Sequence, residues 1–155
     1  MNVDFRHENA IPEQFTCEGE DISPSLYWTD VPEGTQSLAL IVEDPDAPDP
    51  EEPKRTFTHW LLYNLPPDSS GLQAGVDLDS LPPNTAIGAN DFGQLGWVGP
   101  CPPVGRHRYF FKLYALKRKL PAMSPPSRDE LLRQLDAHVI ERAELMGTYE
   151  KHGPL

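Results

Sequence analysis

Three short segments of this sequence gather histidine, aspartate and proline in a way that suits the binding of a small anion. They are Asp44-Pro45-Asp46-Ala47-Pro48, Thr58-His59-Trp60 and the run from Gly99 to Tyr109. Imidazole rings and the backbone N–H groups of a glycine-containing loop can donate hydrogen bonds to an anion. A carboxylate that accepts from a histidine orients the ring and favours its cationic form. We therefore expect His59 and His107 to converge beside Asp44 at the mouth of one proline-walled cavity.

The same residues allow two other kinds of chemistry. His59, His107 and Asp44 form a two-histidine, one-carboxylate set, a ligand combination known for iron and zinc. A hydrolase needs an activated nucleophile, but the chain has no G-x-S-x-G motif and nothing around Ser23 marks it as activated. Cys101 could act as a nucleophile beside His107, although a small loop residue with a useful backbone N–H is the simpler interpretation. We expect binding without catalysis, metal or cofactor, and keep a hydrolase or metal-dependent enzyme as the alternative.

Strands must position most of these side chains. The continuous apolar run 37–42 predicts a strand that is buried on both faces. Segments 57–64 and 107–116 also read as strands, the latter central in its sheet. Because side chains alternate along a strand, His59 should share a face with Leu61, and His107 with Tyr109.

A helix is predicted near the C-terminus of the chain. Ser127 and Glu130 form a capping box, and Leu131, Leu135 and Val139 follow at four-residue spacing. Alternation over 145–149 then indicates a short closing strand. Strands joined by loops, with one peripheral C-terminal helix, favour an antiparallel β-sandwich.

Prolines and cysteines mark the loops. The bonds Ala47–Pro48 and Pro102–Pro103 lie in tight turns next to strand ends, where cis-proline is tolerated. Cys17 and Cys101 are too few and too far apart for a zinc knuckle or a C-x-x-C redox pair. We expect free thiols in a reducing cytosol, while one long-range disulfide stays open if the compartment is oxidising.

The whole chain limits the class of protein. Its 155 residues suit one domain, 1–155. The formal charge of −11 argues against nucleic acid and anionic membrane surfaces as partners. No apolar stretch approaches the roughly 20 residues of a membrane-spanning helix, and the first residues do not form a secretory signal. We expect a cytoplasmic protein.

Taken together, these motifs resemble those of the phosphatidylethanolamine-binding protein family, in its bacterial and archaeal branch called Raf-kinase-inhibitor-like. The resemblance rests on ISPSLYW at 22–28, DPDAP at 44–48, HW at 59–60, GPCPP at 99–103 and HRY at 107–109, and runs from about residue 15 to residue 149. It implies a Greek-key β-sandwich with C-terminal helices and a small pocket for phosphate, acetate or a phospholipid headgroup. The pocket residues that it implies are Asp44, Pro48, His59, Gly99, Cys101, Pro102, His107 and Tyr109.

The resemblance also bears on partners. Family members are described as modulators of kinase pathways or inhibitors of serine proteases, so a kinase or protease partner is an expectation. Position 54 departs from the animal pattern, because Lys54 stands where an aromatic residue is expected, with Phe57 closer to His59. The segment 43–52 carries six acidic residues in ten, which favours a soluble ligand over an anionic membrane. Leu26, Trp28 and Trp97 could form a homodimer contact, although core packing is the simpler reading.

Overall fold

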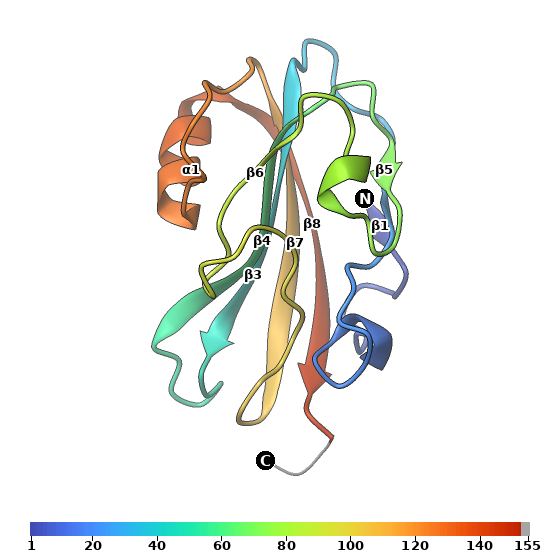
Figure 1. Cartoon of the computed structure of the whole chain (residues 1–155), viewed down its shortest axis with the longest axis vertical. Coiled ribbons are helices and arrows are strands. Elements are labelled where there is room, and N and C mark those ends of the chain that lie inside the picture. Colours follow the sequence, from blue (N-terminus) through green and yellow to red (C-terminus); the bar gives the residue numbers. More distant parts are fainter. Residues whose placement is uncertain (153–155) are drawn as a thin grey trace.

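The computed structural model describes residues 1–152 and is built on a five-stranded antiparallel sheet with the order β6-β4-β3-β7-β8. A small antiparallel sheet with the order β1-β2-β5 lies on one side of it, and helix α1 lies on the other side (Figure 1). The fold is therefore mainly β, as predicted. The strands are β1 (Asn2–Val3), β2 (Leu26–Tyr27), β3 (Ser37–Ala47), β4 (Arg55–Leu65), β5 (Gly71–Leu72), β6 (Ala86–Ile87), β7 (Arg106–Leu116) and β8 (Val139–Glu150). The helices are α1 (Arg128–Leu135) and the short 3-10 turns η1 (Glu13–Phe15), η2 (Leu78–Ser80) and η3 (Asp136–His138).

The middle strand β3 is buried on both faces, as its continuous apolar sequence predicts. Leu38, Leu40 and Val42 belong to the core cluster beneath the small sheet, whereas Ala39 and Ile41 belong to the cluster beneath α1. A strand covered on both sides needs apolar residues at every position. Strand β7, which was predicted to be central, lies between β3 and β8.

Helix α1 begins where the capping box predicts and ends earlier than its apolar spacing suggests. The Ser127 side chain accepts a hydrogen bond from the Glu130 N–H. The helix stops at Leu135, and Val139 instead opens β8, a strand of twelve residues that pairs with β7 along its whole length. Pairing with β7 therefore outweighs the four-residue spacing, because β-branched Val139 and Ile140 suit an extended strand.

Two irregularities in the pairing of β3 with β4 shape the end of the sheet where the candidate site lies, one between Val42 and Glu43 and one between Asp44 and Ala47. In the pairing of β3 with β4, Val42 faces Trp60 and Glu43 faces Thr58, so His59 is an extra residue in β4. A bulge turns neighbouring side chains towards the same side of a sheet. As a result, His59 contacts Tyr109, while Leu61 packs in the α1 cluster on the opposite face. The predicted shared face of His59 and Leu61 is therefore wrong.

Two smaller expectations have opposite outcomes. Leu26 and Trp28 are 2% and 3% exposed, so the simpler reading, core packing, is confirmed for them. Within residues 1–152, Ala47–Pro48 is the one cis peptide bond, and the cis bond expected at Pro102–Pro103 is a wrong prediction. None of the helices in this part of the chain is long and apolar enough to cross a membrane.

Candidate ligand-binding site

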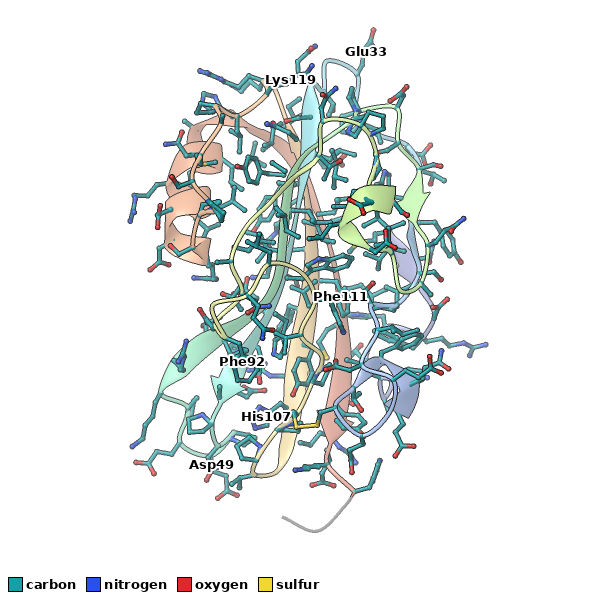
Figure 2. The ribbon with its side chains drawn as sticks, viewed as in Figure 1. Glu33, Asp49, Phe92, His107, Phe111 and Lys119 are labelled. Carbon is teal, nitrogen blue, oxygen red and sulfur yellow. A yellow bond between two sulfur atoms is a disulfide. The ribbon has the colours of Figure 1, made fainter. Side chains whose placement is uncertain are left out.

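One cavity brings together the polar residues singled out from the sequence. It has a volume of about 320 Å³ and opens where the end of β3 meets the starts of β4 and β7. Figure 2 shows His107 and Phe92 at this end of the large sheet. All eight predicted pocket residues line it, namely Asp44, Pro48, His59, Gly99, Cys101, Pro102, His107 and Tyr109. Five further lining residues were not predicted, namely Ala47, Arg55, Phe57, Phe92 and Pro103.

His107 lies in the wall of the cavity with both ring nitrogens engaged. Its Nδ1 is 2.6 Å from Asp44 Oδ2, and its Nε2 is 3.0 Å from the Pro48 carbonyl and 2.9 Å from the Val104 carbonyl. Because a carbonyl can only accept, Nε2 must carry a hydrogen. The His107 ring is 1% exposed and has no free N–H for a ligand. The structure thus differs from the expectation that both imidazoles lie at the mouth and donate to an anion.

Asp44 holds His107 in this orientation. Besides the bond to His107, its Oδ1 accepts a 2.7 Å hydrogen bond from the Asp46 N–H. Burial raises the pKa of Asp44, although the bonds from His107 and Asp46 favour the carboxylate. Since His107 Nε2 is always protonated here, the short Nδ1–Oδ2 contact contains one proton that the two residues share. The pair is therefore neutral as a whole.

Asp46 fixes the segment that carries Asp44 and Pro48. The Arg108 side chain donates from Nε and Nη2 to the Asp46 carboxylate at 3.0 and 2.9 Å, and the Arg108 N–H donates to it at 2.9 Å. Burial alone would raise the pKa of Asp46, but these bonds from Arg108 lower it. A forked contact of this kind fixes orientation as well as charge, so the end of β3 is tied firmly to β7.

His59 lies on the opposite wall, and its free nitrogen is an acceptor. Its Nδ1–H donates to the Val98 carbonyl at 2.6 Å, which leaves the lone pair of the neutral ring on Nε2. Burial lowers the pKa of His59 to about 4, although the Val98 carbonyl and the charge of Asp91 favour the cation. Within the described chain, Nε2 makes no hydrogen bond and is not among the buried polar atoms without a partner. It is therefore open to the cavity.

Tyr109 supplies a donor between the two histidines. Its ring lies edge-on to His59 at 5.2 Å and stacks with His107 at 6.3 Å. Burial, reinforced by the charges of Asp44 and Asp46, raises the pKa of Tyr109 well above its ordinary value. The phenol therefore stays protonated, and among residues 1–152 no partner binds its hydroxyl.

The loop 99–103 offers fewer donors than its glycine suggests. The Gly99 N–H donates to Asp21 Oδ1 at 2.8 Å, and the three prolines of this loop have no N–H. The N–H of Cys101 makes no hydrogen bond to the described residues and remains available. A Cβ at position 99 would lie 2.2 Å from Asp21 Oδ1 and 2.4 Å from the Phe15 carbonyl, so glycine is required there.

A disulfide ties this loop to the segment after η1. Cys17 and Cys101 are bonded to each other, and the Cys17 N–H donates to the Pro100 carbonyl at 3.1 Å. The expectation of free thiols is therefore wrong. The bonded sulfur also excludes Cys101 as a nucleophile, which was the less favoured interpretation of this residue. Sequence spacing could not reveal this pair, since 84 positions separate the two cysteines.

The rim of the cavity is aromatic and carries one ion pair. Phe57 and Phe92 meet edge to face at 5.2 Å, and Phe92 is 62% exposed. The Arg55 guanidinium lies 5.3 Å from the Phe57 ring and 2.9 Å from the Asp91 carboxylate. Position 54 has no aromatic residue, and Phe57 and Phe92 supply the aromatic rings of the rim instead. Phe57 could have been found from its place beside His59, whereas Phe92 lies in an irregular loop without a pattern.

The metal alternative finds no support in this arrangement. Among residues 1–152, no group of three or more histidine, cysteine, aspartate or glutamate side chains is arranged to hold a metal ion. Both nitrogens of His107 are already bound to protein oxygens, which leaves none for a metal. The set His59, His107 and Asp44 therefore does not form a three-ligand site.

Comparison with known proteins gives one consistent result. The family model described as "Phosphatidylethanolamine-binding protein" matches residues 2–150. A UPF0098 protein of Methanothermobacter thermautotrophicus is 46% identical over 148 residues, which cover 95% of each chain. A solved phosphatidylethanolamine-binding protein homologue from Chlamydia trachomatis is 41% identical with a TM-score of 0.86, covering 96% of this chain and 94% of its own. Escherichia coli YbcL, described as a member of the mammalian family, is 35% identical with a TM-score of 0.87, covering 97% of both chains.

Proposed function

Because the chain belongs to the phosphatidylethanolamine-binding protein family, we propose that its cavity binds a small anionic group, such as phosphate, a carboxylate or a phospholipid headgroup. The observation that supports this most is that all eight residues expected from the motifs line one cavity of about 320 Å³. That volume is at the lower end for ligand sites. It accommodates a phosphoryl or carboxyl group with its nearest atoms and leaves no room for a whole lipid.

Within the cavity, we assign different roles to the two histidines. Asp44 and His107 are positioning residues, because their polar atoms are occupied by each other and by carbonyls. In the wall of the cavity, Tyr109, the Cys101 N–H and His59 Nε2 are the polar groups left to contact a ligand. At the rim, Arg55 pairs with Asp91 through Nη2 and keeps further N–H groups. The organic part of the ligand then lies against the aromatic rim of Phe57 and Phe92.

Isothermal titration with phosphate, acetate and phosphoethanolamine tests this function. We expect saturable binding of one molecule per chain for at least one of these compounds, and competition between the compounds that bind. Native mass spectrometry of protein purified without added phosphate would identify a ligand carried from the cell. A chain that binds none of the three compounds at millimolar concentration would contradict the proposal.

We further propose that ligand in the cavity modulates a protein partner of the kinase or protease type. The supporting feature is that the cavity opens beside exposed groups that a partner could contact, with Phe92 and Val104 62% and 49% exposed. Affinity capture from the native host, with and without 10 mM phosphate (a roughly saturating concentration for a weak site), tests this. An identical set of captured proteins in both conditions would contradict it.

We propose that the protein is cytoplasmic, and the disulfide limits the kind of cytosol in which it can lie. Disulfides persist in oxidising compartments and in the cytosol of some hyperthermophiles, and they are rare elsewhere. The Cys17–Cys101 bond therefore requires a cytosol of that kind. Fractionation of native cells after rapid thiol alkylation should find the oxidised protein in the cytosolic fraction. If the oxidised protein were found only outside the cytosolic fraction, that result would contradict a cytoplasmic location.

A further inference from the structure

The two histidines of the cavity have four ring nitrogens, and three of them are engaged by protein oxygens. His107 uses both of its nitrogens on Asp44, Pro48 and Val104, and His59 uses Nδ1 on Val98. The fourth nitrogen, His59 Nε2, is left without a partner in the described chain. Since the Val98 carbonyl takes the ring hydrogen on Nδ1, the neutral His59 ring offers the cavity a lone pair and no donor.

A lone pair at this place conflicts with a fully ionised ligand. An anionic oxygen facing Nε2 would set acceptor against acceptor, unless a proton lies between the two atoms. We propose that the cavity selects a group that brings this proton with it, namely the monoanion of a phosphate monoester, over a phosphodiester. This inference rests on the proposed function, because it names the class of phosphoryl group that the same cavity takes.

The groups around His59 agree with this preference. Asp91 is the nearby charge that favours a proton on the ring, but it is already paired with Arg55 at 2.9 Å. From β7, His107 in its pair with Asp44 of β3 adds to the lowering of the His59 pKa, and Tyr109 is an uncharged phenol. The Phe57 ring packs against the His59 ring, with the two centroids 4.8 Å apart, and adds to its burial. Protonation of His59 itself is therefore costly, as its pKa of about 4 indicates.

A monoester monoanion matches the three polar groups in the wall of the cavity one by one, while Arg55 at the rim stays paired with Asp91. Its P–OH can donate to His59 Nε2, and its P–O⁻ can accept from the Tyr109 hydroxyl and the Cys101 N–H. A phosphate monoester has a second pKa of about 6, so at neutral pH the ligand gains one proton from solvent on binding. A phosphodiester has no second acidic oxygen, and its binding would place the proton on His59 instead.

Two ligands with the same ammonium group separate these cases. Phosphoethanolamine is a monoester, and glycerophosphoethanolamine is a diester. In isothermal titration at pH 7, we expect phosphoethanolamine to bind about a hundredfold more tightly, because a gap of two units separates the ligand pKa of about 6 from the His59 pKa of about 4. Titration in two buffers of different ionisation enthalpy should show an uptake of nearly one proton per phosphoethanolamine. Above pH 7 its affinity should fall about tenfold per pH unit as the monoanion is depleted.

His59→Gln tests the role of the ring nitrogen. A glutamine amide can donate to an anionic oxygen, so the preference for the monoester and the proton uptake should both largely disappear. If this variant does not fold, the buffer comparison on the unmodified protein decides alone. Binding of phosphoethanolamine without proton uptake, or equal affinity for both ligands, would overturn the inference and leave the proposed function standing. Failure of both ligands and of phosphate and acetate to bind would remove the proposed function, and the inference with it.

Discussion

Asp44 and His107 share a single buried proton, because His107 Nε2 must keep its hydrogen for two carbonyls while Nδ1 lies 2.6 Å from Asp44 Oδ2. The two side chains are 4% and 1% exposed. This pair links the end of β3 to the start of β7 and forms one wall of the cavity. Its integrity is therefore a condition for the shape of the site.

Replacement of Asp44 should distinguish between the loss of charge and the loss of hydrogen bonds. In Asp44→Asn, the amide N–H can donate to Nδ1 of a neutral His107, and the amide oxygen can still accept from the Asp46 N–H. We expect this variant to lose about 1 kcal/mol of unfolding free energy, and Asp44→Ala to lose about 3 kcal/mol, because alanine leaves buried polar groups unpaired. Urea unfolding at pH 7 measures both. Equal losses in the two variants would argue against a shared proton.

His59 should make the protein less stable in mild acid. Its pKa is lowered from 6.5 to about 4 in the folded chain, so between these values the unfolded chain binds a proton that the folded chain does not. This contribution to stability is complete above pH 6.5 and is lost as the pH falls towards 4. The total loss is about 3.5 kcal/mol, at about 1.4 kcal/mol per pKa unit. Unfolding curves at several pH values should show this loss, and His59→Phe should reduce it.

The Tyr109 hydroxyl should donate a hydrogen bond to the ligand. A change that removes only this hydroxyl tests its contribution. Tyr109→Phe keeps the ring contacts with His59 and His107 and removes the O–H. We expect phosphate or phosphoethanolamine to bind about 1.5 to 3 kcal/mol more weakly, the contribution of a hydrogen bond to a charged group, with little change in stability. Titration calorimetry measures this. Tyr27→Phe, at a side chain that is 53% exposed and far from the lining residues, should not change the affinity.

The Cys17–Cys101 disulfide should stabilise the fold and hold the loop 99–103 in place. A cross-link between residues 84 positions apart greatly reduces the conformational entropy of the unfolded chain. Reduction, or the change of both cysteines to serine, should therefore lower the free energy of unfolding by about 2 to 4 kcal/mol. Thermal unfolding with and without reductant measures this loss. Thiol titration of the denatured, unreduced protein should find no free thiol, and two free thiols there would contradict the structure.

Gly99→Ala should be more damaging than an alanine at a glycine in open space. The added Cβ would meet Asp21 and the Phe15 carbonyl at 2.2 and 2.4 Å. At Gly93, nothing lies within 4 Å, and the cost comes from its positive φ of 74° alone. We expect about 1 kcal/mol for Gly93→Ala and about 3 kcal/mol for Gly99→Ala, together with weaker binding for the latter. Similar losses for both, with unchanged binding, would argue against the close approach at Gly99.

Most of the large sheet is predictable from the sequence, because buried strand positions require apolar residues in a recognisable pattern. The apolar run of β3, the alternation of β7 and the capping box before α1 each correspond to an element of the structure. The end of α1 was missed, since Val139 fits both a helix spacing and a strand, and only the partner strand β7 decides between them. The residues around Val139 alone cannot indicate whether a distant strand is available for pairing.

The candidate site was predictable in its members but not in their orientation. The eight residues that the motifs single out all line one cavity, and their role in binding a ligand stays a prediction. However, simple alternation puts His59 on the face of Leu61, and only the bulge opposite Val42 and Glu43 turns it towards Tyr109. His59 also donates to the carbonyl of Val98, 39 positions away, and His107 to that of Pro48, 59 positions away, and a carbonyl has no sequence signature. Which nitrogen faces a ligand therefore had to come from the structure.

A crystal structure with phosphoethanolamine tests the central claim most directly. We predict that the phosphoryl group lies in the cavity within hydrogen-bond distance of His59 Nε2 and the Tyr109 hydroxyl, with the Asp44–His107 bond intact. A phosphoryl group bound directly to His107 with that bond broken, or bound outside this cavity, would contradict it.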